Sequence, residues 1–204
     1  MKIVALVLAG GEGTRLYPLT AEHSKPALPF ANGYRIVDFV LSNLVNSKIS
    51  TIYVLAQYKP DSLMRHIAAS WAPWLNAPGS VIKVLLPRSN RQLFRGTADA
   101  VHQCLEVLHA HSPDVVAIFA ADHVYRMDVR QMIDFHCARE ADVSVAAVGV
   151  PAPAVAPFAL YNCTRPVPAG VVNSELSMPI FRSTHSSEST LPVTMAISGM
   201  SPSV

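Results

Sequence analysis

The chain has 204 residues, half of them hydrophobic, so it is long enough to hold one sizeable domain with a buried core. Its formal net charge is only +2 and both signs are mixed along the sequence, which argues against nucleic acid or an acidic membrane surface as a partner. Three widely spaced cysteines favour a reducing, cytoplasmic location over a disulfide framework. No apolar stretch reaches the roughly 18 residues of a membrane span.

The first 150 residues alternate between strand-like and helix-like segments. The short, apolar and β-branched segments are Ile3–Leu8, Thr51–Ala56, Val81–Leu85, Val115–Ala120 and Val143–Val148. Segments with helical spacing lie at Arg35–Asn46, Pro60–Ala69, Thr97–His109 and Met127–Arg139. This alternation predicts an α/β fold with a doubly wound, mostly parallel sheet, in which ligands bind at the carboxyl ends of the strands.

The first strand leads into a glycine loop, Gly10-Gly11-Glu12-Gly13-Thr14-Arg15-Leu16. Glycines allow a tight turn and bring backbone N–H groups close to anionic oxygens. Thr14 can add a hydroxyl donor, while Arg15 and Lys25 supply positive charge. We therefore expect this loop to bind a nucleoside triphosphate.

Two commoner glycine motifs do not fit this loop. A P-loop requires a lysine directly after its last glycine, and none is present. A dinucleotide-binding fingerprint requires a third glycine where Leu16 stands. For the glycines alone, an ordinary strand-to-loop turn remains the alternative.

The strand Val115–Ala120 leads directly to Asp122, at the same predicted edge of the sheet as the glycine loop. A carboxylate in this place is suited to hold Mg²⁺ on a triphosphate. The alternative for this residue is an aspartate that caps the following turn. Its coincidence with the glycine loop favours the metal-binding interpretation.

Two further candidates follow other elements. Gly96 and Thr97 begin a predicted helix, where free N–H groups and a hydroxyl cap suit a phosphate or base edge. The alternative there is a plain helix cap. Gln57 closes the second strand and could read a base through its amide. The histidines do not have the spacing of a zinc site.

Together these residues resemble the sugar-phosphate nucleotidyltransferases, and in particular the N-terminal part of the glucose-1-phosphate adenylyltransferases. The matching segments are Leu6–Leu16, Lys25-Pro26-Ala27, Arg35–Phe39, Leu41-Ser42-Asn43, Gln57-Tyr58, Arg95–Ala100 and Ala121-Asp122-His123. The glycine loop by itself marks only the broad superfamily. Arg35–Asn43 and Arg95–Ala100 indicate the adenylyl branch over the thymidylyl, uridylyl and guanylyl branches.

The resemblance implies a Rossmann-like nucleotidyltransferase fold and a reaction, with Mg²⁺, that converts ATP and glucose 1-phosphate into ADP-glucose and pyrophosphate for glycogen or starch synthesis. It implies catalytic roles for Arg15, Lys25 and Asp122, with Asp122 as the metal ligand. It implies nucleotide contacts by Leu8, Ala9, Gly10, Gly11, Gly13, Thr14, Gln57, Gly96 and Thr97. No general base is required, because the second pKa of a phosphate monoester is about 6.

The resemblance is expected to end near residue 150. The Phe-Gly, Glu-Lys-Pro and Trp-Arg-Asp segments of such enzymes, and their C-terminal β-helix, do not follow. Leu93 also stands where an aromatic residue is common. Residues 151–204 are rich in proline and serine and carry only four charged groups, Arg165, Glu175, Arg182 and Glu188.

We therefore expect residues 1–150 to form an incomplete nucleotidyltransferase domain, and 151–204 to be a poorly ordered tail from truncation or a frameshift. The homo-oligomeric state of the family, which depends partly on the β-helix, is not expected to carry over. Two alternatives stay open: a catalytically inactive nucleotide-binding fragment, and a related sugar-phosphate nucleotidyltransferase that uses another nucleoside triphosphate.

Overall fold

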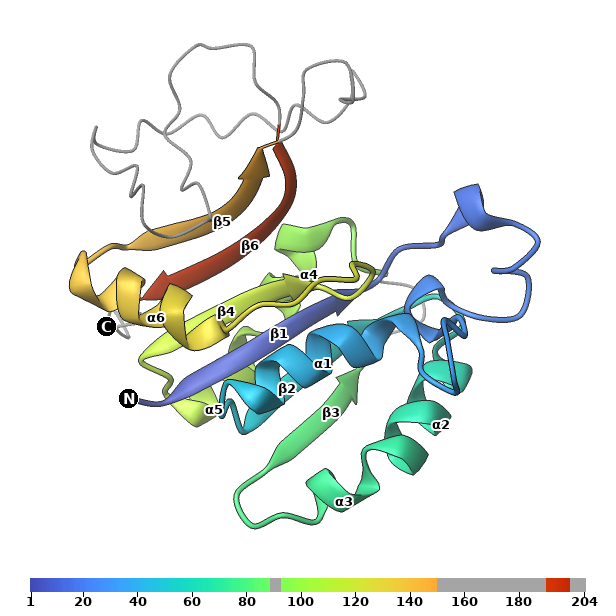
Figure 1. Cartoon of the computed structure of the whole chain (residues 1–204), viewed down its shortest axis with the longest axis horizontal. Helices are drawn as coiled ribbons and strands as arrows, with labels where there is room; N and C mark the ends of the chain where they lie inside the picture. Colours follow the sequence, from blue (N-terminus) through green and yellow to red (C-terminus); the bar gives the residue numbers. More distant parts are fainter. Residues whose placement is uncertain (89–92, 150–189, 199–204) are drawn as a thin grey trace.

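A single mixed sheet organises the residues that the computed structural model describes, which are 1–88, 93–149 and 190–198 (Figure 1). Its strand order is β3-β2-β1-β4-β6-β5. The strands β1 (Ile3–Ala9), β2 (Thr51–Ala56), β3 (Val81–Leu85) and β4 (Val115–Ala120) are parallel. The strand β6 (Thr190–Ser198) is antiparallel to both of its neighbours, β4 and β5 (Val143–Gly149).

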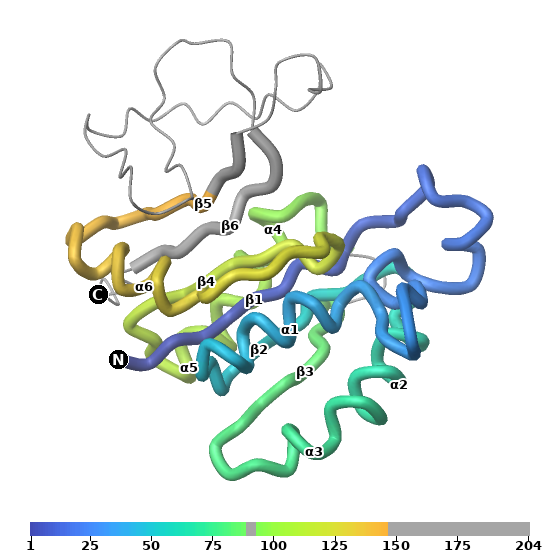
Figure 2. Tube along the Cα trace, in the orientation of Figure 1, coloured from blue at the N-terminus to red at the C-terminus, as the bar shows by residue number. Residues whose placement is uncertain are grey.

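Helices cover both faces of this sheet, as Figures 1 and 2 show. One face packs against α1 (Ile36–Asn46), α2 (Pro60–Ser70) and α6 (Val129–Ala138), and the other against α4 (Thr97–Gln103) and α5 (Leu105–His111). Each face of the sheet has its own hydrophobic core, and alternate residues of β1 point to opposite faces. Ala5 and Val7 pack in the core on the α1 side, and Val4 and Leu6 pack in the second core, on the α4 side. The predicted doubly wound α/β fold is thus confirmed.

Short helices complete the described chain. The turns η1 (Thr14–Leu16) and η2 (Lys25–Ala27) lie between β1 and α1, and α3 (Ala72–Leu75) follows α2. The five predicted strands and the predicted helical segments are all present. One predicted helix, 97–109, is instead two, because the Cys104 N–H bonds to the carbonyl of Val101, three residues back, and interrupts the α-helical ladder.

The strand β6 corrects one expectation about the segment after residue 150. That segment shows no sustained helical or strand period, yet residues 190–198 form a strand between β4 and β5. An alternation was present but short: Leu191, Val193, Met195 and Ile197 are separated by smaller or polar residues and proline. The rest of the predicted tail, 150–189 and 199–204, lies outside the described residues. The domain boundary near 150 stays a prediction.

Replacing Leu6 by alanine should lower the free energy of unfolding by about 2–5 kcal/mol, because this side chain is fully buried in the second core. Urea unfolding followed by circular dichroism measures the change. The matched control is Leu19→Ala in the loop after β1, where the leucine is 65% exposed and the change should stay within about 0.5 kcal/mol. Equal effects of the two substitutions would contradict this core assignment.

Candidate functional site

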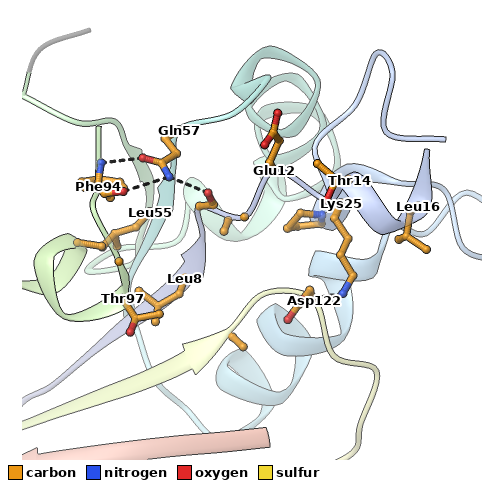
Figure 3. A pocket seen from close by; sticks show the side chains of 18 of the residues that line it. Leu8, Glu12, Thr14, Leu16, Lys25, Leu55, Gln57, Phe94, Thr97 and Asp122 are labelled. Carbon is orange, nitrogen blue, oxygen red and sulfur yellow. Dashed lines mark hydrogen bonds and ion pairs between the residues drawn. The ribbon is translucent and has the colours of Figure 1, made fainter. Parts of the chain in front are cut away.

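A cleft of about 640 Å³ opens at the carboxyl ends of β1 and β4 (Figure 3). It is lined by the end of β1, the glycine loop, the start of η2, Gln57, the Phe94–Ala100 segment and the end of β4 with Asp122. Every site residue proposed from the sequence lies in this lining. The topology explains the convergence, since parallel strands end at a common edge and their following loops meet there.

Gly13 is the position of the glycine loop at which the backbone requires glycine. Its φ of +74° lies in the left-handed region, which side chains disfavour. A Cβ atom there would lie 2.9 Å from Thr20 Cγ2 and 3.3 Å from Lys25 Cβ. Nothing lies within 4 Å of a Cβ built on Gly11, so the two glycines differ in what they tolerate. The loop is therefore folded tightly onto residues 20–25.

Gly13→Ala should destabilise the ligand-free protein by at least about 1–2 kcal/mol, through the left-handed backbone, before the clash with Thr20 is added. Gly11→Ala is the matched control and should change stability by less than about 1 kcal/mol, because the added methyl meets open space. Chemical denaturation without nucleotide compares the two. A Gly13 variant as stable as the wild type would mean that the loop is not held in this conformation.

Lys25 and Asp122 form an ion pair across the cleft, with Lys25 Nζ 2.7 Å from Asp122 Oδ2 (Figure 3). The two side chains are 30% and 35% exposed. Partial burial raises the pKa of the Asp122 carboxyl, but the hydrogen bond from Lys25 and the nearby charges of His123 and Lys25 outweigh burial and hold that pKa below its usual value. The sequence predicted both residues at this site, but not their direct contact.

Lys25→Met should raise the pKa of Asp122, because burial persists while the hydrogen bond and the charge are lost. Carboxyl ¹³C NMR titration measures it, with Lys83→Met on β3 as a control of equal charge change outside the cleft lining. In the wild type, the depressed pKa contributes stability above pH of about 4 that is lost as the pH falls through it. An unchanged Asp122 pKa in the Lys25→Met variant would contradict the assigned cause.

Gln57 joins two walls of the cleft. Its Nε2 donates to the Gly10 carbonyl at 2.8 Å and to the Phe94 carbonyl at 3.4 Å, and its Oε1 accepts the Phe94 N–H at 2.7 Å (Figure 3). In this structure the amide therefore fixes the glycine loop to the segment before α4. The contact with a base that we expect for Gln57 stays a prediction. Both ends of the amide bond to backbone groups here, so a base would have to share or replace one of these bonds.

Gly96 and Thr97 line the cleft, but the expected hydroxyl cap is not formed. The N-cap residue of α4 is Gly96, which has no side chain, and no side-chain cap bond is made there. The Asp99 carboxylate instead accepts the Arg95 N–H at 3.0 Å. Exposed Gly96 and Thr97 thus contribute backbone groups and a hydroxyl to the wall, and their contact with nucleotide stays a prediction.

The sequence analysis did not assign a role to several lining residues. Glu12 is exposed in the glycine loop and points away from the Lys25–Asp122 pair in Figure 3. Apolar walls come from Leu16, Pro26, Leu55, Phe94, Ala100 and Ala120. Their apolar character alone resembles that of any core residue, so only the fold reveals them as part of the cleft. Arg15 is exposed and belongs to the lining as predicted.

Two carboxylates line the cleft, those of Glu12 and Asp122, and Asp122, which pairs with Lys25, is the candidate metal ligand. Within residues 1–88, 93–149 and 190–198, no three His, Cys, Asp or Glu side chains converge to hold a metal ion. Mg²⁺ commonly binds through one or two carboxylates together with substrate phosphates and water. Asp122, ionised and partly exposed at the cleft edge, fits that mode and not a cage built by protein alone.

The chain belongs to the nucleotidyl transferase family, since the model of that family matches residues 4–158. Within this family, the chain is similar to curated glucose-1-phosphate adenylyltransferases. The chain is 54% identical over 150 residues to the glucose-1-phosphate adenylyltransferase of Thermodesulfovibrio yellowstonii, covering 72% of this chain and 36% of that enzyme. It is 44% identical over 157 residues to that of Thermus caldophilus, covering 74% and 38%.

The match to the glucose-1-phosphate adenylyltransferase of Mycobacterium ulcerans is 42% identical over 181 residues and covers 87% of this chain and 44% of that enzyme. It extends past residue 150, where we expected the resemblance to end. The chain spans less than half the length of these relatives.

A solved structure supports the fold. A putative glucose-1-phosphate thymidylyltransferase from Bacillus anthracis, in complex with a sucrose, matches with a TM-score of 0.65 at 18% identity, covering 95% of this chain and 70% of that one. In the part of the chain that the structure describes, no helix is long and apolar enough to cross a membrane.

Proposed function

We propose that this chain carries the nucleotide-binding part of a glucose-1-phosphate adenylyltransferase, with ATP bound in the cleft at the carboxyl ends of β1 and β4. The observation that carries the proposal is the convergence of the glycine loop, Lys25, Gly96-Thr97 and Asp122 on one opening. The names of the curated relatives support adenylyl transfer over transfer of another nucleotide. Because ATP and glucose 1-phosphate are the proposed substrates, we further propose that the protein works in the cytoplasm.

In the proposed reaction, a phosphate oxygen of glucose 1-phosphate attacks the α-phosphorus of ATP. The new oxygen–phosphorus bond yields ADP-glucose, the bond between the α-phosphorus and its bridging oxygen breaks, and pyrophosphate leaves with the electron pair. The attacking phosphate is largely ionised at neutral pH, so the protein need not remove a proton. Its task is to orient the reactants and to stabilise negative charge.

The residues of the cleft suit this task. Arg15 and Lys25 bring positive charge to the phosphates, and the N–H groups of the glycine loop offer further donors. Asp122 would hold Mg²⁺, which when bound neutralises phosphate charge and orients the phosphates. Because Asp122 Oδ2 accepts the Lys25 hydrogen bond, a cation bound at that same oxygen would compete with this lysine.

A second candidate is a protein that binds nucleotide without turnover. It is favoured by residues 151–204, in which the Glu-Lys-Pro segment of the family does not occur. Pyrophosphate release by the purified chain with Mg²⁺, ATP and glucose 1-phosphate separates the two. Release supports adenylyl transfer, whereas ATP binding without release supports the second candidate.

Arg15→Ala and Asp122→Asn should each weaken Mg·ATP binding by about 10- to 100-fold, because each removes a charged partner of the phosphates or their metal. Isothermal titration calorimetry measures the dissociation constants. Arg65→Ala on α2 and Asp134→Asn on α6 are matched controls, exposed and outside the cleft lining. Unchanged affinity in both site variants would refute the site assignment.

A further inference from the structure

The chain between β1 and α1 projects from the carboxyl end of the sheet (Figure 2). Much of its first part is exposed: Tyr17 and Leu19 are 76% and 65% exposed. Thr20, the next residue, is only 3% exposed. Thr20 therefore anchors this stretch of the loop to the domain.

Thr20 contacts the one residue of the glycine loop that must be glycine. Its Oγ1 donates to the Gly13 carbonyl at 2.9 Å, and the same carbonyl accepts the Leu16 N–H at 3.0 Å. A carbonyl oxygen has two lone pairs, so both acceptor positions are occupied. The peptide bond from Gly13 to Thr14 is trans and planar. Fixing the carbonyl therefore also fixes the Thr14 N–H, which points the opposite way.

Lys59 binds the backbone of Thr20, whose side chain contacts Gly13. Its Nζ donates to the Thr20 carbonyl at 2.6 Å, a charge-assisted hydrogen bond. Lys59 is the N-cap residue of α2 and follows β2 closely, so the bond ties the exposed loop to the frame of the domain. Contacts thus run from Lys59 through Thr20 to Gly13, although neither Thr20 nor Lys59 lines the cleft.

We propose that Thr20 and Lys59 are positioning residues that hold the glycine loop in the conformation that receives phosphate. The inference rests on the nucleotide-binding function proposed above and adds a specific claim to it. Because the contacts end at Gly13 and the Thr14 peptide, these residues govern binding of the phosphate chain and leave binding of the adenosine part unaffected.

The test compares two ligands, inorganic tripolyphosphate and adenosine, each with Mg²⁺ and the full chain, by calorimetry. Thr20→Val removes the hydroxyl and keeps the shape, and Lys59→Met removes the charge. Each should weaken tripolyphosphate binding about tenfold while adenosine affinity stays within about twofold. Thr20→Ser and Lys59→Arg keep the donor and should restore most of the tripolyphosphate affinity.

Lys48→Met is the matched control. Lys48 also has a left-handed backbone, with φ of +61° against +45° for Lys59, and lies at the amino ends of the strands, far along the sheet from the cleft. It should leave both affinities unchanged. Unchanged tripolyphosphate affinity in Thr20→Val and Lys59→Met, or an equal loss for adenosine, would overturn the positioning role.

Hydrogen exchange at the Leu16 amide, which donates to the Gly13 carbonyl, tests the same inference without any ligand. The amide should exchange faster in both Thr20→Val and Lys59→Met than in the wild type. Unchanged exchange would show that the two residues do not hold the loop. A wild-type chain that binds neither Mg·ATP nor tripolyphosphate would overturn the proposed function instead, while the exchange rates still decide whether these residues fix the loop.

Discussion

The described structure depends on the parallel pairing of β1 with a strand on each side. Leu8 lies opposite Leu55 of β2 and Ala120 of β4, so the three strands end at nearly the same level. The chain must leave each of them at one edge of the sheet, because parallel neighbours share a direction. That constraint brings the glycine loop, Gln57 and Asp122 to one cleft from positions far apart in the sequence.

Contacts among the loops then fix the cleft before any ligand binds. Gln57 joins the glycine loop to Phe94, Lys25 joins η2 to Asp122, and Thr20 closes the turn at Gly13. A site whose donors are already oriented loses less conformational entropy when it binds. The ion pair acts in the opposite sense, because Lys25 Nζ and Asp122 Oδ2 already occupy each other before a ligand arrives.

The segment Arg35–Asn43 supports the site from outside it. The buried Asp38 carboxylate accepts the Arg35 N–H at 2.7 Å and the Trp71 Nε1–H at 2.8 Å, and His66 Nε2 lies 2.8 Å from it. Arg35 in turn donates through Nη1 to the Ala27 carbonyl at 2.6 Å, two residues after Lys25. A buried carboxylate is costly unless hydrogen-bond partners surround it, which explains why Arg35, His66 and Trp71 converge on Asp38.

The sequence by itself determined the alternation of strands and helices, and with it the sheet edge at which the site lies. Apolar periodicity, the glycines after β1 and Asp122 after β4 were sufficient, because these signals are local along the chain. Tertiary structure alone decided which side chains pair. The Lys25–Asp122 contact, the use of the Gln57 amide and the link from Lys59 to Thr20 join residues 97, 47 and 39 positions apart. No local sequence pattern encodes such contacts, because they depend on how the elements pack in space. The same holds for the insertion of β6 between β4 and β5.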